Sequence, residues 1–169
     1  MDQVAQLIET FGSRATLSVR SKLDVLTDLV RLRDPRVVPF LLDVLADQRQ
    51  PMSVRIQVLK RLRNGTLAPT NRPLVAEAML RVVSDRSSPD LQVNAALALA
   101  EFTEIDGVPT TLGRLALDQH EPIELRFSAF TSLQRAGPTP ECLALLRQLE
   151  VDESLGRSAR SVLSLWRPE

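Results

Sequence analysis

Aromatic residues are scarce in this chain of 169 residues, which has five phenylalanines, one tryptophan and no tyrosine. Its core therefore has to be filled by leucine, valine and alanine. This composition favours packed helices over β-sandwiches, whose strands are rich in β-branched and aromatic residues. Strict alternation of apolar and polar residues, the pattern of a half-buried strand, is not sustained anywhere.

Cysteine and long apolar runs are also scarce. A single cysteine, Cys142, excludes an intrachain disulfide framework. The first residues lack the basic start and apolar core of a secretory signal. No apolar run approaches the length that crosses a membrane, about 20 residues. We therefore expect a cytoplasmic protein with no membrane partner.

An internal repeat organises the chain, since apolar residues three and six positions before an aspartate recur four times. The aspartates are Asp47, Asp85, Asp118 and Asp152, separated by 38, 33 and 34 residues. In the first three copies a proline follows four residues later. A proline is tolerated in the first turn of a helix, where its missing N–H has no helical partner. Each copy therefore predicts one helix ending near the aspartate and a second beginning near the proline.

The second helix of each repeat is predicted from a set of four residues. The last three follow the first by three, four and seven positions, so all four share one helix face. The reference set is Arg55, Val58, Leu59 and Leu62. The matching sets are Lys22, Val25, Leu26, Leu29; Val93, Ala96, Leu97, Ala100; Arg126, Ala129, Phe130, Leu133; and Ser158, Ser161, Val162, Leu165.

Prolines and glycines mark the predicted helix boundaries. Seven of the eleven prolines precede or open a helix: Pro35, Pro51, Pro73, Pro89, Pro109, Pro122 and Pro140. Asp34 and Thr139 are candidate N-caps, and Gly65, Gly107 and Gly137 follow second helices, where a left-handed residue is expected. The resulting ten helices are 2–11, 18–33, 35–46, 51–63, 72–84, 89–103, 109–117, 122–136, 140–150 and 154–166. No linker divides them, so we expect one all-α domain over 1–169.

These copies resemble HEAT repeats, especially the short bacterial kind found in proteins of the phycobilin-lyase type. The segment 40–47, followed by Pro51 and Val54-Arg55, fits that pattern best, and Asp118 with Leu125-Arg126 is close to it. The third copy departs with Gln92-Val93, and the fifth with Gly156-Arg157. The resemblance implies an α-solenoid of about five antiparallel helix pairs, with second helices lining a concave face. Tetratricopeptide repeats have a similar period but need tyrosine and a fixed set of glycines.

The repeated aspartates and arginines have a structural and a chemical interpretation. An aspartate in a turn accepts hydrogen bonds from backbone N–H groups or pairs with an arginine of a neighbouring repeat. A catalytic carboxylate pair belongs to one site, whereas these carboxylates recur with the fold. We therefore expect the aspartates, Arg55 and Arg126 to support the repeat.

Histidine and cysteine offer little further chemistry. The only histidine, His120, falls in a predicted turn, where an exposed side chain is expected. Cys142 falls on the apolar side of a predicted helix, where a thiol acts as a small apolar group. Phosphate loops, paired CxxC motifs and zincin motifs are all missing. We expect no catalytic residue, cofactor or metal, and no enzyme.

Charge is unevenly distributed although the net charge is zero. Residues 1–86 contain 14 basic and 9 acidic side chains, and residues 87–169 contain 7 and 12. No acidic residue occurs between Asp47 and Glu77, a stretch in which we predict a partner-binding set. The predicted set is Arg55, Lys60, Arg61, Arg63 and Arg72. The alternative is a solvated helix face on which arginine stems cover apolar surface.

The last helix offers a second contact candidate, because Leu165 and Trp166 are followed by no polar capping helix. Either Trp166 folds back onto its own repeat, or this end docks on a second copy or on further repeats of a longer array. We add Trp166 to the predicted contact residues.

The sequence favours a non-enzymatic scaffold that binds an unidentified protein through the concave face. One alternative is a HEAT-like protein that uses the basic stretch to bind nucleic acid. The acidic second half and the lack of stacking aromatics argue against that alternative. Another is a phycobilin-lyase-type subunit, which the resemblance alone suggests.

Overall fold

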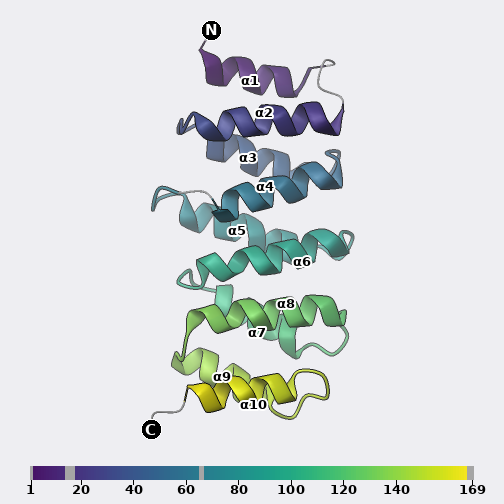
Figure 1. The fold of residues 1–169 in the computed structure, drawn as a ribbon, viewed down its shortest axis with the longest axis vertical. Coiled ribbons are helices and arrows are strands. Elements are labelled where there is room, and N and C mark those ends of the chain that lie inside the picture. The colour runs from purple at the N-terminus through teal and green to yellow at the C-terminus, as the bar shows by residue number, and fades with distance from the viewer. Residues whose placement is uncertain (1, 14–17, 65–66, 167–169) are drawn as a thin grey trace. The chain divides into compact units, whose positions relative to one another are not determined.

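The computed structural model describes residues 2–13, 18–64 and 67–166, and Figure 1 shows its ribbon. Within these residues the chain is all-helical and has no strand. The ten α-helices are α1 (Gln3–Phe11), α2 (Val19–Arg31), α3 (Val37–Ala46), α4 (Met52–Asn64), α5 (Arg72–Val83), α6 (Pro89–Ala98), α7 (Val108–Leu117), α8 (Ile123–Leu133), α9 (Pro140–Leu149) and α10 (Gly156–Leu165). Two short 3₁₀ helices, η2 (Leu99–Phe102) and η3 (Gln134–Ala136), extend α6 and α8. The predicted all-α class and the ten predicted helices are confirmed.

Proline and cap residues fix where these helices begin. Six of the seven prolines predicted to start helices lie within one residue of an observed start; the exception is Pro35, which precedes α3 by two residues. Thr139 is confirmed as an N-cap, because its side chain accepts a hydrogen bond from the Cys142 N–H. Asp34 instead accepts from the Arg36 N–H, in the turn before α3. The Thr139 cap satisfies a backbone donor that the start of α9 would otherwise leave without a partner.

Two of the three glycines predicted to follow second helices have a positive φ, but only Gly107 is left-handed, and it is the N-cap of α7. Gly107 has φ of 90° and Gly137 has φ of 76°, both in the region that disfavours residues with a β-carbon. Gly137 directly follows η3, which extends the second helix α8, whereas Gly107 directly precedes α7. Gly65, the third predicted glycine, lies outside the described residues.

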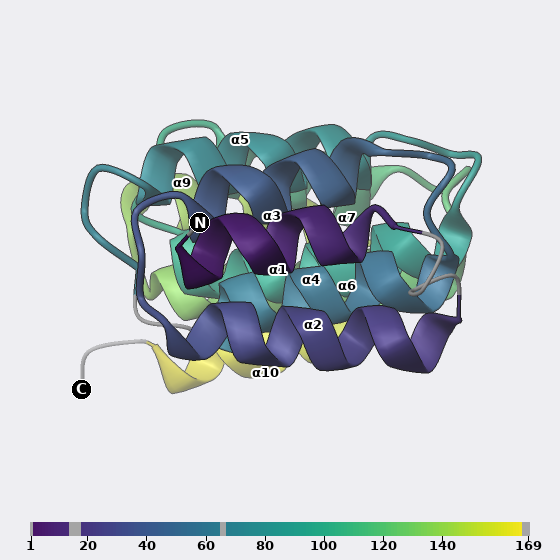
Figure 2. The ribbon, with the colours of Figure 1, turned by 90° about the horizontal axis from the view of Figure 1, so that it is seen from above.

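The chain divides into two compact units, residues 1–78 and 79–169, with the boundary inside α5. In unit 1, α2 packs against α1 and α4, and α3 packs against α4. Figure 2 shows α1 and α3 on one side of this unit and α2 and α4 on the other. No linker separates the units, and the single repeat domain over 1–169 stays a prediction.

Unit 2 repeats the same kind of pairing. Here α7 packs against α8 and α9, α8 packs against α6, and α9 packs against α10. Ser132 of α8 donates a hydrogen bond to the Ala96 carbonyl of α6, with an oxygen–oxygen distance of 2.7 Å. This bond fixes the two neighbouring second helices side by side.

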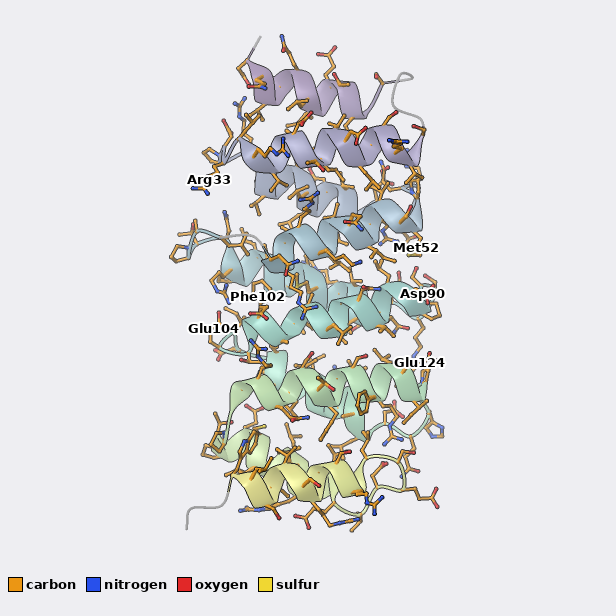
Figure 3. All side chains as sticks on the ribbon, in the orientation of Figure 1. Arg33, Met52, Asp90, Phe102, Glu104 and Glu124 are labelled. Atoms are coloured by element: carbon orange, nitrogen blue, oxygen red, sulfur yellow. The ribbon has the colours of Figure 1, made fainter. Side chains whose placement is uncertain are left out.

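The core of each unit is aliphatic, as the composition predicts. Six of the predicted second-helix positions in unit 1 are buried and apolar, at 7% exposure or less: Val25, Leu26, Leu29, Val58, Leu59 and Leu62. In unit 2 the largest fully buried ring is that of Phe102, which Figure 3 labels. At about 25 cal/mol per Å² of apolar area, such burial is the main stabilising contribution to a helical unit.

The predicted register is wrong by one residue in two helices. On α6 the predicted face was Val93, Ala96, Leu97 and Ala100, whereas the structure buries Leu91, Gln92, Ala95, Ala96, Ala98 and Leu99. On α10 the predicted face was Ser158, Ser161, Val162 and Leu165, whereas the structure buries Gly156, Ala159, Val162 and Leu163. The helices α6 and α10 begin four residues after their turn aspartates, Asp85 and Asp152, whereas α4 and α8 begin five residues after Asp47 and Asp118. The buried face therefore begins one residue sooner after the aspartate in α6 and α10.

Candidate binding surface

The four repeated aspartates lie in the turns between paired helices, where they stabilise the turn. Each accepts a hydrogen bond through Oδ1 from the backbone N–H two residues later, at nitrogen–oxygen distances of 2.9 to 3.0 Å. The donors are Arg49, Ser87, His120 and Ser154. The expectation that these carboxylates support the repeat is confirmed.

A polar side chain near the start of each of four second helices bonds to a carbonyl at the end of the preceding helix. The pairs are Arg55 Nε to Leu45 O at 2.8 Å, Gln92 Nε2 to Val83 O at 2.9 Å, Arg126 Nε to Ala116 O at 3.0 Å, and Arg160 Nη1 to Glu150 O at 2.6 Å. Because a helix end leaves its last carbonyls without intrahelical donors, these bonds satisfy groups that would otherwise cost free energy. Sequence comparison missed Gln92 and Arg160 in this role.

Arg55 therefore has to be removed from the predicted partner-binding set. Its side chain is buried, with only 5% of the residue exposed, and its guanidinium faces the end of α3. A buried charge needs such a partner, because desolvation without one is expensive. Arg126 is buried in the same way and also forms an ion pair with Asp152 in the turn before α10.

The rest of the predicted basic set on α4 stays at the surface. Lys60 is exposed, and Arg61 and Arg63, which follow it on α4, are partly exposed. The Arg61 Nη2 donates to Thr27 Oγ1 of the neighbouring α2 at 2.9 Å. Lys60, Arg61 and Arg63 form what we call the α4 basic face.

The last two predicted contact residues lie at helix ends. Arg72 is the first residue of α5, is partly exposed and takes part in an interaction. Trp166 is partly exposed and ends α10, where its backbone N–H bonds to the Val162 carbonyl. Its neighbour Leu165 is 82% exposed.

Histidine and cysteine lie where the sequence places them. His120 is exposed in its turn. Cys142 is buried, its Sγ lies 3.5 Å from the Leu133 carbonyl, and burial raises the pKa of its thiol to about 11. Among the described residues, no group of three or more histidine, cysteine or acidic side chains is arranged to hold a metal ion. Because of its raised pKa and its burial, the Cys142 thiol is neutral and shielded from solvent at physiological pH.

Among the described residues, each unit has an open hollow at helix ends. The hollow in unit 1 is lined by Phe11, Lys22, Asp47, Arg49 and Gln50, with Gly12 and Ser13. Lys22 lies 5.2 Å from the Phe11 ring centre and donates to Gln50. The hollow in unit 2 lies beside the starts of α7 and α9 and includes Glu104, Asp106 and Glu141. The charged side chains that line the hollow in unit 1 have partners within the fold, because Lys22 bonds to Gln50 and Asp47 pairs with Arg49.

Sequence analysis missed a set of exposed apolar side chains on unit 2. Ile123 and Phe127 of α8 are 50% and 54% exposed, and Val151 in the turn before α10 is 91% exposed. Ile123 and Phe127 fall outside the three-four-seven spacing of the buried face, and that mismatch was the signal available in the sequence.

None of the helices in the described part of the chain combines the length and hydropathy that crossing a bilayer requires. No model of a known protein family matches the chain, and no curated protein matches it significantly in sequence.

Proposed function

We propose that the chain is a HEAT-like helical repeat protein that binds another protein and performs no catalysis. In this proposal the helix pairs continue as one solenoid of about five repeats, the second helices line its concave face, and the protein acts as a cytoplasmic scaffold. The repeated bond from a second helix to the end of the first supports this, because four helix pairs use the same device. Solenoids with such repeats bind through extended surfaces.

The observation that carries the proposal is the separation of charged groups by role. Arg55 and Arg126 are buried and bond to backbone carbonyls, whereas Lys60 is exposed and Arg61 and Arg63 are partly exposed, with Arg61 bonded to Thr27 of α2. A surface with several positive charges attracts an acidic protein segment and accelerates its association. Asp24 and Asp28 are exposed on the adjacent α2 and limit the patch on that side.

The test is charge reversal on α4 in the full chain. Lys60→Glu with Arg63→Glu changes the patch and leaves the Arg61 bond to Thr27 in place. We expect the partner that co-purifies from the native cell to bind at least about tenfold more weakly, because two attractive charges become repulsive. Affinity purification identifies the partner, and titration calorimetry measures its Kd.

The matched control is Arg114→Glu with Arg147→Glu. Both residues are exposed, and they lie on the first helices α7 and α9, so the net charge changes equally away from α4. Retention of every partner by the α4 variant would contradict the proposal. A gel shift with DNA or RNA at low salt, lost in the α4 variant only, would instead support the nucleic-acid alternative.

The phycobilin-lyase-type alternative gains no supporting observation from the cysteine. A thiol that holds a pigment has to reach it and react as the thiolate. Cys142 is buried and its thiol pKa is raised. We therefore keep protein binding as the proposed function.

A further inference from the structure

Three of the six large apolar side chains that are exposed within the described residues belong to one edge of unit 2. Ile123 and Phe127 are four residues apart on α8 and therefore share a helix face. Val151 lies in the turn between α9 and α10 and is 91% exposed. We call Ile123, Phe127 and Val151 the unit 2 apolar edge.

A buried ion pair brings the parts of this edge together. Arg126 lies one turn after Ile123 on α8, and its guanidinium pairs with Asp152, the residue that follows Val151. Both side chains of the pair are only 6% exposed. The first turn of α8 is thereby fixed against the turn that contains Val151, and Figure 1 shows both at the same edge of this unit.

The exposed area is large for side chains without a contact role. Together the three side chains present on the order of 300 Å² of apolar surface, the lower range for the largest patch on a typical monomer. Patches of this size commonly bind something, whereas single exposed apolar residues need no explanation.

The charges beside the unit 2 apolar edge are mainly negative. Glu124 follows Ile123, Glu153 follows Asp152, and both are exposed. Figure 3 shows Asp90, at the start of α6, on the same side of the unit as Glu124.

The basic groups on this side are few. The Arg86 guanidinium is already held by Glu121 at 2.9 Å and lies 4.0 Å from Asp118. Arg157 is exposed in the first turn of α10, and His120 is exposed in the turn before α8. Residues 79–169 as a whole contain 13 acidic and 9 basic side chains.

We propose that the unit 2 apolar edge is a docking site for an amphipathic partner segment whose apolar side chains are flanked by lysine or arginine. The apolar side chains of the partner would cover Phe127, Ile123 and Val151, and its cations would lie against Glu124 and Glu153. An acidic partner is disfavoured by these same carboxylates. A second copy of the chain is disfavoured as well, because a symmetric contact would place the carboxylates against themselves.

This site goes beyond the proposed function, because it lies in the other unit and its chemistry is opposite to that of the α4 basic face. A chain with both surfaces holds an acidic partner at one and a basic partner at the other. The two sites are therefore separable by mutation.

The binding test uses two synthetic helical peptides with the same leucine spacing. One carries lysine at every polar position, and the other carries glutamate. The measurement uses the full chain carrying Lys60→Glu and Arg63→Glu, because the α4 basic face of the unmodified chain would itself attract the glutamate peptide. With this chain, fluorescence anisotropy should show binding of the Leu/Lys peptide and at least about tenfold weaker binding of the Leu/Glu peptide. Added salt should weaken the Leu/Lys complex.

Variants then locate the site. Phe127→Ser with Val151→Ser, and separately Glu124→Lys with Glu153→Lys, should each weaken the Leu/Lys peptide by about tenfold or more. Leu74→Ser is the apolar control, because Leu74 is 53% exposed on α5. Glu9→Lys with Asp24→Lys is the charge control, since both are exposed in unit 1. Circular dichroism melts verify that each variant is folded.

The controls and the Lys60→Glu, Arg63→Glu variant should keep wild-type affinity for the Leu/Lys peptide. If the proposal for the α4 basic face is wrong, the proposal for the unit 2 apolar edge can therefore still be tested, and the reverse also holds. Equal binding of the two peptides to the Lys60→Glu, Arg63→Glu chain would overturn the docking proposal. Equal losses in Leu74→Ser and in the Phe127, Val151 variant would overturn it too. Self-association in analytical ultracentrifugation that disappears in the Phe127, Val151 variant would show that a second copy covers the edge, and the proposal would be wrong.

Discussion

At the scale of single residues, one carbonyl at the end of a first helix is satisfied by one side chain of the following helix. Arginine does this in three pairs and glutamine in one. Gln92 lies seven residues after Asp85, whereas Arg55 lies eight after Asp47, so a shorter side chain spans a shorter connection. Within the described residues no buried side-chain nitrogen or oxygen atom lacks a hydrogen-bond partner. Buried polar side chains of this kind cost little free energy of folding as long as each keeps its hydrogen-bond partner.

Removing these side chains should destabilise the fold, and the loss should be larger when more buried polar groups are left without a hydrogen-bond partner. Gln92→Leu leaves one carbonyl without its donor and should lower the free energy of unfolding by about 1–2 kcal/mol. Arg126→Met leaves a carbonyl and also the buried Asp152 carboxylate, so about 3–5 kcal/mol is expected. Urea unfolding followed by circular dichroism measures both. A larger loss for Gln92→Leu than for Arg126→Met would contradict this account.

At the scale of helices, two glycines allow close packing within unit 2, and they differ in what surrounds them. A β-carbon on Gly156 of α10 would lie 2.6 Å from the Glu150 carbonyl oxygen, which belongs to the backbone. A β-carbon on Gly113 of α7 would lie 2.6 Å from the side-chain methyls of Leu145 on α9. A partly exposed leucine can rotate away, whereas the backbone carbonyl is held by Arg160.

The two alanine substitutions should therefore have different effects. Gly156→Ala should destabilise by about 1–3 kcal/mol, because overpacking against a fixed backbone forces it to shift. Gly113→Ala should be close to neutral, because the clash is offset by about 0.5–1 kcal/mol of helix propensity. Thermal melts of the two variants, recorded side by side, provide the measurement. Equal shifts in Tm would show that the nature of the neighbouring atom does not matter.

At the scale of the whole chain, the two units have net charges of opposite sign. Residues 1–78 contain 12 basic and 8 acidic side chains, and residues 79–169 contain 9 basic and 13 acidic side chains.

Several carboxylates have lowered pKa values. Hydrogen bonds from Arg36 lower the pKa of Asp34 to about 2. Burial raises the pKa of Asp152, but hydrogen bonds from the Leu155 N–H and from Arg126 outweigh that effect and lower it overall.

Acid should therefore destabilise the protein. These carboxyl groups have a lower pKa in the folded state than in the unfolded state, where the pKa is about 4. Each therefore stabilises the fold at a pH above its unfolded-state pKa. This stabilisation is lost as the pH falls through the folded-state pKa. We expect the free energy of unfolding to be steady from pH 7 to about 5 and to decrease below about pH 4. Chemical denaturation at a series of pH values tests this.

The control variant is Asp152→Asn, which keeps an oxygen that can accept from the Ser154 and Leu155 N–H groups but removes the charge that pairs with Arg126. It should be less stable than the wild type at pH 7, and the difference should shrink as the pH falls. A difference that stays constant down to about pH 2 would mean that the Asp152 charge does not contribute.

The helices, most of their boundaries and the turn aspartates are determined by the sequence, because spacing, prolines and caps act between residues close in the chain. The tertiary structure alone decided which polar side chains are buried. Arg55 and Lys60 are similar in a basic run, but only Arg55 faces the end of the preceding helix. It also decided the buried faces of α6 and α10 and the ion pair that joins Arg126 of α8 to Asp152 in the turn before α10. These depend on distances between residues far apart in the chain, and spacing along the sequence does not contain them.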